Sequence, residues 1–162
     1  MLCIRPLEQR DIPACVEIYN YYIENTTVTF EETALREADF LARALRIQKT
    51  YPYLVAEKDG AVVGYAYLDA YHERSAYRYT ADLSIYLAHD GLRRGIGSAL
   101  LEKIEGMGRA MGLHSIVAII TEENGRSLAF HARHGYREVG RLYKSGYKFD
   151  RWLDVAFCQK ML

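Results

Sequence analysis

Cysteine is scarce in this chain of 162 residues, and its copies are poorly spaced for shared chemistry. The three cysteines, Cys3, Cys15 and Cys158, are odd in number, lie far apart and form no C-x-x-C pair. This spacing argues against a disulfide framework and against a zinc ribbon, so we expect buried thiols. His131 and His134 could share a helical face, but the sequence identifies no third ligand, and we expect no metal site.

The chain also lacks an excess of charge and a long apolar run. Lys plus Arg and Asp plus Glu number 21 each, so the formal net charge is zero and the basic footprint of a nucleic-acid-binding protein is missing. No apolar run reaches membrane-spanning length, and the N-terminus has no charged region followed by an apolar signal core. We expect a cytoplasmic protein without nucleic-acid or membrane partners. Its length and 50% hydrophobic content fit one domain over residues 1–162.

The most informative segment present is the glycine-containing stretch 90–100. It follows a run, 80–87, in which apolar and polar residues alternate as in a half-buried strand, and it precedes apolar residues at helical spacing. A helix N-terminus leaves amides unpaired and carries partial positive charge, so a pyrophosphate can bind there. Two other phosphate loops are excluded, since no Lys precedes Ser98 and Leu100 stands where G-x-G-x-x-G needs its third glycine. Taken alone, Gly95 and Gly97 are also compatible with a simple tight turn.

Patterns elsewhere predict the order of the remaining elements. The first half should contain a strand over 3–6, a helix over 11–24 capped by Asp11, an extended loop over 25–30, a second helix from near Thr33, and a hairpin of strands 53–58 and 61–69 turning at Asp59-Gly60. The second half should contain a strand over 115–121 buried on both faces, a helix from Asn124 through His134 ended by Gly135, and two terminal strands. This order predicts a mixed α/β sheet domain of the α+β type.

At several places the chain resembles the GCN5-related N-acetyltransferases, and more narrowly the phosphinothricin, methionine sulfone and methionine sulfoximine acetyltransferases. Residues 92–97 resemble the acetyl-CoA pyrophosphate motif Q/R-x-x-G-x-G/A, and residues 124–136 resemble N-x-x-S-x-x-x-H-x-x-x-G-[FY]. The segments 27–30, 74–77 and 146–159 resemble signatures of the narrower group. The resemblance covers nearly the whole chain. It implies a splayed, mostly antiparallel sheet of about seven strands with about four helices.

The resemblance further implies that acetyl-CoA lies along the splay of the sheet. The implied cofactor-binding residues are Ile85, Tyr86, Leu87, Arg93, Arg94, Gly95, Ile96, Gly97, Ser98, Asn124 and Ser127. Leu92 departs from the motif, where Gln or Arg is usual. Because backbone amides hold most of the phosphate, we expect at most weaker positioning from this change.

Asp82 is the candidate general base, because an amine acceptor must lose a proton before it attacks. The narrower group usually has Glu there, so the carboxylate is withdrawn by about 1.5 Å, a gap that a water could bridge. The alternative is a structural ion pair of Asp82 with Arg74 or Arg78. The backbone amide near Tyr86 is the implied oxyanion donor. His131 is the candidate acid for the departing thiolate, with simple packing on an amphipathic helix as its alternative.

Phe30, Arg74 and Tyr77 are the candidate acceptor-binding residues, with Arg74 or Lys144 available to an acidic group, while packing is the alternative for Tyr77. The predicted reaction is acetylation of the α-amino group of a small amino-acid analogue of the phosphinothricin or methionine sulfone type. Two alternatives stay open. One is another amine acceptor, such as a polyamine, an aminoglycoside or a protein N-terminus, and the other is a catalytically silent acyl-CoA-binding regulator. The resemblance also implies a homodimer, for which the aromatic C-terminal region is a plausible contact surface.

Overall fold

One seven-stranded sheet runs through the computed structural model, which describes residues 1–90 and 94–162. Its strands lie in the order β1-β2-β3-β4-β5-β7-β6, and within that order only β4 and β5 pair in parallel among the described residues. The strand bounds are β1 (Leu2–Pro6), β2 (Tyr53–Lys58), β3 (Ala61–Ala70), β4 (Thr80–Leu87), β5 (Ser115–Thr121), β6 (Arg137–Lys148) and β7 (Arg151–Met161). The predicted mixed, mostly antiparallel sheet is confirmed.

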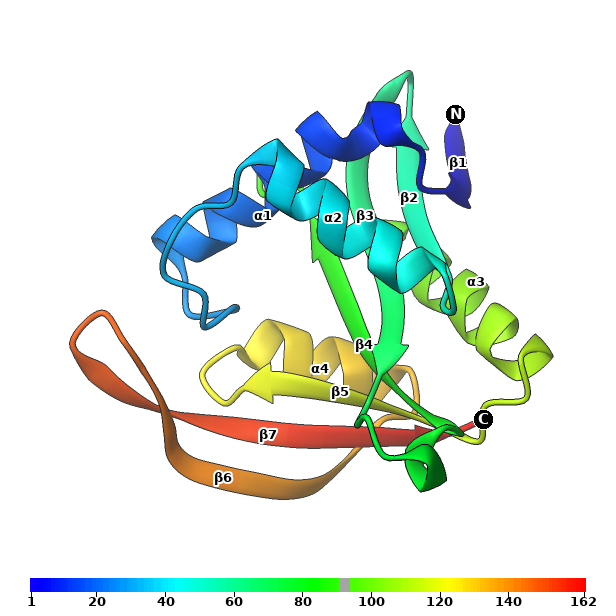
Figure 1. Cartoon of the computed structure of the whole chain (residues 1–162). Coiled ribbons are helices and arrows are strands. Elements are labelled where there is room, and N and C mark those ends of the chain that lie inside the picture. The colour runs from blue at the N-terminus through cyan, green and yellow to red at the C-terminus, as the bar shows by residue number, and fades with distance from the viewer. Residues whose placement is uncertain (91–93) are drawn as a thin grey trace.

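Four α-helices pack on this sheet, as the sequence predicted. Their bounds are α1 (Ile12–Asn25), α2 (Glu37–Gln48), α3 (Ile96–Ala110) and α4 (Gly125–Arg133), with short 3₁₀ turns at Gln9–Asp11 and Ser75–Tyr77. Figure 1 shows α1 and α2 together over the β2–β4 region, α3 on the other side of it, and α4 beside β5.

Two local predictions about the N-terminal helices were wrong. The second helix begins at Glu37, because the Asn20 side chain holds the backbone N–H and carbonyl of Leu35 at 2.9 Å each and keeps the preceding residues out of the helix. Asp11 stands at the start of α1 but does not cap it. Its carboxylate instead accepts two hydrogen bonds from Arg5, at 2.7 and 2.8 Å.

The predicted hairpin between β2 and β3 is confirmed. Asp59 and Gly60 both have positive φ, 51° and 83°, as a two-residue turn of this kind requires. The next strand, β4, continues the antiparallel meander with Tyr65 opposite Tyr86 and Tyr67 opposite Ser84. This register directs the three tyrosines to the face that α1 and α2 cover.

The sheet divides into two arms where β4 meets β5. The N-terminal arm consists of β1–β4 and the C-terminal arm of β5, β7 and β6. Among the described residues the arms are joined by three register pairs, Thr80–Ser115, Ala81–Ile116 and Asp82–Val117. Beyond them the two strands diverge, as the steep β4 and the flat β5 of Figure 1 show.

The core has two parts, one on each side of the sheet. The cluster under α3 crosses both arms, with Leu68 and Leu83 from one and Ile116 and Ala118 from the other. The cluster under α1 and α2 covers only the N-terminal arm. On the corresponding face of the C-terminal arm Ile119 is 43% exposed, so β5 is not buried on both faces along its whole length as predicted.

The C-terminal hairpin extends beyond the rest of the molecule, at the left of Figure 1. It contacts the loop after α1, where the Phe30 ring lies so close over Gly146 that an added Cβ would meet it at 2.3 Å. The buried Lys148 ammonium donates to the Thr29 carbonyl at 2.9 Å in the same contact. The loop is thus held by the far end of the chain.

The cysteines only partly follow the prediction. Cys15 and Cys158 are buried, but Cys3 is exposed, because its strand β1 forms an edge of the sheet. Within residues 1–90 and 94–162 there is no helix long and apolar enough to cross a membrane.

Candidate active site

The divergence of β4 and β5 opens a narrow cleft, which we call the splay cleft. Its lining residues come from the loop after α1, both strands and the start of α4: Val28, Leu83, Ser84, Ile85, Tyr86, Ala118, Ile119, Ile120, Thr121, Asn124, Ser127 and His131. Because the β4–β5 ladder ends at Asp82–Val117, the backbone groups that β4 directs toward β5 beyond this point have no ladder partner there. The walls of the cleft therefore offer backbone donors and acceptors to an extended, amide-containing ligand.

The N-terminus of α3 has the features of an anion site. Gly95 precedes the helix with φ 80°, a left-handed conformation that glycine adopts without strain. The first intrahelical bond is Ala99 N–H to Gly95 O at 3.0 Å, so the amides of the first helical turn have no acceptor within the helix. Arg94 is exposed beside them. The other predicted phosphate residue, Arg93, lies outside the described residues, as does Leu92.

Gly97 and Ser98 connect this helix start to α4. A Cβ on the buried Gly97 would lie 3.3 Å from the Phe130 ring and 3.6 Å from Leu87, so the glycine permits close packing of α3, α4 and β4. The Ser98 hydroxyl forms a 3.0 Å hydrogen bond with His134 Nε2. The predicted phosphate-binding segment is thereby anchored to the helix that lines the splay cleft.

At the start of α4, Asn124 caps the helix as predicted, since its side chain accepts a hydrogen bond from Ser127 N–H at 3.2 Å. Two turns later His131 is only 6% exposed. Its Nδ1 lies 2.8 Å from the Ser127 carbonyl, which can only accept, so we assign the proton to Nδ1. Burial lowers the pKa of His131, and the ring is then mostly neutral at pH 7 with Nε2 as an acceptor.

Asp82 lies at the closed end of the splay cleft, directly before the lining residues Leu83 and Ser84. It forms no ion pair with Arg74, Arg78 or any other residue that the structure describes, so the structural alternative for Asp82 is not supported. The pKa of Asp82 is raised to about 7, mainly by burial and to a smaller extent by the neighbouring Asp69 carboxylate. A carboxylate with such a pKa can accept a proton from an amine near neutral pH and still release it.

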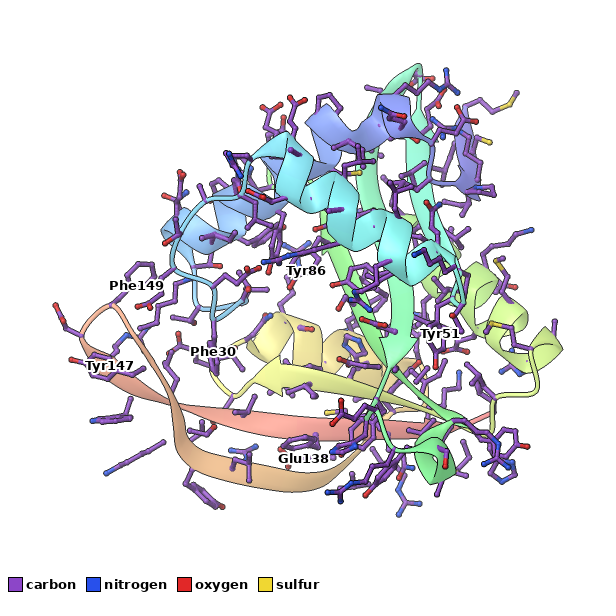
Figure 2. The ribbon with its side chains drawn as sticks, viewed as in Figure 1. Phe30, Tyr51, Tyr86, Glu138, Tyr147 and Phe149 are labelled. Carbon is purple, nitrogen blue, oxygen red and sulfur yellow. The ribbon has the colours of Figure 1, made fainter. Side chains whose placement is uncertain are left out.

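The predicted acceptor residues are more widely spread. Arg74 and Tyr77 are exposed in the connection from β3 to β4, where the Tyr77 ring packs on Tyr71 and His72 at centroid distances of 5.7 and 4.9 Å. Phe30 lies apart from them, between its loop and the C-terminal hairpin, as Figure 2 shows. Arg74 and Tyr77 are joined by a hydrogen bond from Tyr77 N–H to the Arg74 carbonyl at 3.0 Å, and Phe30 is not part of this group.

Sequence reasoning missed two features of the site. Val28, in the β-branched run before Phe30, lines the splay cleft itself. A second cavity of about 390 Å³ lies between α2 and β3, and its walls combine aromatic rings with Arg43, Arg46 and Asp69. No local pattern marks these residues, because only tertiary packing places a helix over this part of the sheet.

Among the described residues no three His, Cys, Asp or Glu side chains are grouped closely enough to hold a metal ion. The groups present are backbone groups of β4 beyond the end of the β4–β5 ladder, a helix N-terminus and a partly buried carboxylate. They are suited to binding a phosphate-bearing amide ligand and moving a proton beside it.

Comparisons with known proteins show which family this chain resembles. The model of the Acetyltransferase (GNAT) domain matches residues 4–157. The chain is 37% identical to a phosphinothricin N-acetyltransferase of Streptomyces viridochromogenes, covering 97% of this chain and 86% of the relative. It is 38% identical to an L-methionine sulfoximine/L-methionine sulfone acetyltransferase of Pseudomonas paraeruginosa, covering 96% and 92%. A solved phosphinothricin acetyltransferase of Sinorhizobium meliloti, in complex with acetyl-CoA, superposes with a TM-score of 0.95 at 37% identity, covering 99% and 88%.

Proposed function

The chain belongs to the GNAT acetyltransferase family, and from this premise we propose that residues 1–162 act as one N-acetyltransferase domain that uses acetyl-CoA. The observation that carries the proposal is the splay cleft between β4, β5 and the start of α4. Its lining on β4 begins at Leu83, directly after Asp82, a partly buried carboxylate without an ion-pair partner among the described residues. Relatives named as acetyltransferases, one of them solved with acetyl-CoA, support the same donor.

For the donor, we assign the pyrophosphate to the amides of Gly95, Ile96, Gly97 and Ser98, with Arg93 and Arg94 adding positive charge. Ile85, Tyr86 and Leu87 would bind the pantetheine arm through their backbone, and Asn124 and Ser127 would flank it. The fit rests on the break in the β4–β5 ladder, which leaves backbone groups of β4 without a ladder partner and able to pair with an amide-containing chain. The Leu87 carbonyl already accepts a hydrogen bond from the Tyr22 hydroxyl, so Ile85 and Tyr86 would provide most of this pairing.

For the proton, we assign Asp82 as acceptor. An α-ammonium group is mostly protonated at pH 7, whereas the attacking nitrogen needs a free electron pair. The proton passes from the ammonium nitrogen to a carboxylate oxygen of Asp82, directly or through one water, since the Asp side chain is one methylene shorter than Glu. The neutral amine then attacks the thioester carbonyl, and a C–N bond forms. When the tetrahedral intermediate collapses, the C–S bond breaks, coenzyme A leaves as a thiolate, and the second proton of the nitrogen passes to this thiolate or to water, which leaves the N-acetyl product.

As that carbonyl becomes tetrahedral, its oxygen gains negative charge and needs a fixed donor, for which we propose the backbone N–H near Tyr86. We assign His131 a minor role, as an acid that protonates the departing thiolate. It must first gain a proton at Nε2 before it can donate to the thiolate, and a thiolate needs little assistance because thiol pKa values lie near 8.5.

For the acceptor, we propose the α-amino group of a small amino-acid analogue of the kind named in the relatives, phosphinothricin, methionine sulfoximine or methionine sulfone. Arg74 is exposed and available to an acidic group of such a molecule, and Tyr77 and Phe30 are further candidates for its surroundings. Other amines stay the second candidate acceptors, because this chain has Asp82 where the narrower group usually has Glu. The shorter Asp side chain suits an acceptor that binds deeper in the site or contacts the carboxylate through a water.

We also propose that the chain forms a homodimer through the exposed apolar surface of the C-terminal arm. On its hairpin Tyr143 is 75% and Trp152 is 62% exposed. Large apolar side chains gathered on one surface are typical of an interface. Its cytoplasmic location and its lack of nucleic-acid and membrane partners stay predictions from the sequence.

The test is release of coenzyme A thiol from acetyl-CoA in the presence of L-methionine sulfone, L-methionine sulfoximine or phosphinothricin, with a blank that lacks acceptor. Release that depends on the acceptor, with mass spectrometry finding the N-acetyl product, supports the proposal. Release only with a polyamine, an aminoglycoside or a peptide N-terminus would replace the acceptor. Tight acetyl-CoA binding without turnover on any amine would favour the silent binder.

A further inference from the structure

Two carboxylates face each other where the end of β3 pairs with the start of β4. Asp69 of β3 and Asp82 of β4 are direct register partners in an antiparallel pair. Side chains in such positions point to the same face of the sheet with Cβ atoms roughly 4.5–5.5 Å apart, and like charges there repel. A plain structural role would not favour this pairing.

The two carboxylates differ in their partners. Arg46 of α2 binds both oxygens of Asp69, with Nη1 3.3 Å from Oδ1 and Nη2 2.9 Å from Oδ2. The backbone N–H of Ala70 also donates to Asp69, at 2.8 Å. Asp82, by contrast, has no ion pair with any described residue, and a hydrogen bond with the Leu83 backbone only partly offsets its burial. One carboxylate is therefore compensated and the other is free to exchange a proton.

The surroundings contain few other groups that could titrate with this pair. Tyr67 of β3 faces the pair. Its pKa is raised mainly by burial, and Asp82 is the neighbouring charge that raises it most, so the phenol stays neutral. From α2, Arg43 lies beside Arg46 but is bound to Glu31. The other neighbouring strand, β5, has no titratable side chain from Ser115 to Thr121. Tyr51, which precedes β2, also interacts with Asp69; burial first and this carboxylate next raise its pKa, so it stays neutral as well. The effect of Asp69 on Asp82 can thus be tested without a competing group that ionises near neutral pH.

We propose that Asp69 and Arg46 are positioning residues for acetyl transfer, which together hold Asp82 in the state that accepts the acceptor's proton. Asp69 supplies the negative charge that makes Asp82 a stronger base, and Arg46 limits that charge so that Asp82 is still ionised at neutral pH. The inference rests on the proposed function, in which Asp82 is the base. It adds that a pair on a neighbouring strand and helix sets the pH at which this base works.

Replacing Asp69 and replacing Arg46 should shift the pH dependence of kcat/KM in opposite directions. Asp69→Asn removes the repelling charge, so the acidic limb of the kcat/KM profile should move to lower pH by about one unit, and the maximal rate should fall because the base is weaker. Arg46→Gln leaves Asp69 uncompensated, so the limb should move to higher pH by a similar amount. Arg36→Gln, which removes an exposed ion pair with Asp39 at the start of the same helix, should leave the limb unchanged.

The experiment measures kcat/KM from pH 5 to 9 for these variants and the parent, together with a ¹³C NMR titration of the Asp82 carboxyl group assigned with Asp82→Asn. Opposite shifts in both readouts support the inference. Shifts in the same direction, or a uniform loss of rate without a shift, would overturn it, since damage to packing does not move a titration in two directions. If no acceptor is turned over, the proposed function fails, while the NMR titration still decides the coupling of Asp69, Arg46 and Asp82.

Discussion

The N-terminal arm buries its tyrosines between sheet and helices, whereas the C-terminal arm carries large apolar side chains in contact with solvent. Tyr53 and Tyr65 stack with ring centroids 5.9 Å apart under α1 and α2, and Tyr86 packs on Tyr65 at 5.5 Å. In Figure 2, Tyr86 lies within this layer, while Tyr147 and Phe149 lie at the end of the C-terminal hairpin. Among the exposed large apolar side chains of the described residues, only Leu2 belongs to a strand of the N-terminal arm.

The difference follows from how the helices are distributed. Helices α1 and α2 form a second cluster on the N-terminal arm alone, so a carboxylate on that face loses water and its pKa rises. The matching face of the C-terminal arm has no helix from the described part of the chain. The covered arm is therefore suited to proton transfer, and the uncovered arm is the surface on which we place the proposed dimer contact.

The sharpest test of this division replaces Asp82, the partly buried carboxylate of the covered arm. Asp82→Asn should lower kcat about 10²- to 10⁴-fold, as loss of a general base does, while the affinity for acetyl-CoA stays within a factor of two. Steady-state kinetics and a calorimetric titration with acetyl-CoA measure the two effects. The exposed turn variant Asp59→Asn is the matched control and should keep full turnover. Unchanged turnover in Asp82→Asn would remove this residue from the mechanism.

The same substitution should reveal the desolvation of the covered arm as a change in stability. The pKa of Asp82 is about 7 in the folded protein, compared with 3.8 for an unperturbed Asp, which represents the unfolded chain. The folded state therefore binds the proton more tightly. Stability is thus lost as pH rises from about 4 to 7. Asp82→Asn abolishes this loss, and its Tm relative to the parent should rise by several degrees between pH 4.5 and pH 8, since each pKa unit corresponds to about 1.4 kcal/mol. Equal Tm differences at both pH values would mean that the group is not desolvated.

On the uncovered arm, Trp152→Glu should weaken the proposed dimer. Its ring packs on Tyr147 with centroids 4.9 Å apart, and a charge in an apolar interface loses hydration. We expect the dimer dissociation constant to rise about 30-fold or more, measured by analytical ultracentrifugation over a concentration series. Leu45→Glu, at an exposed position on α2, is the control. A parent protein that is monomeric at all concentrations would contradict the proposed use of this arm.

The smallest effect is expected for a substitution at the start of α3, where this helix packs against α4. Gly97→Ala places a methyl group 3.3 Å from the Phe130 ring and should displace the first turn of α3, raising the Kd for acetyl-CoA about threefold to tenfold. Gly106→Ala, in the same helix with nothing within 4 Å of the added Cβ, should leave this Kd unchanged. An unaltered affinity in Gly97→Ala would place the phosphate contacts away from the helix start.

Local signals predicted most of the fold. The Asp59-Gly60 turn, the alternation in β4 and the Asn124 cap depend on residues close together in the chain, and the structure confirms all three. The start of α2 could not be predicted in the same way, because Asn20 holds Leu35 from a different helix. Cys3 is exposed for a similar reason, as nothing in its own strand shows that β1 ends the sheet.

For the site, the sequence by itself determined which groups are present: the glycines before α3, the Asn124 cap, and a carboxylate in β4. These depend on backbone conformation and on spacing within one element, which neighbouring residues largely decide. Only the tertiary structure decided that Asp82 faces Asp69, that Arg46 reaches across from α2 to bind one carboxylate and not the other, and that Phe30 rests on Gly146. The physical reason is that desolvation and charge coupling depend on which distant segments pack together, and no single segment of the chain contains that information.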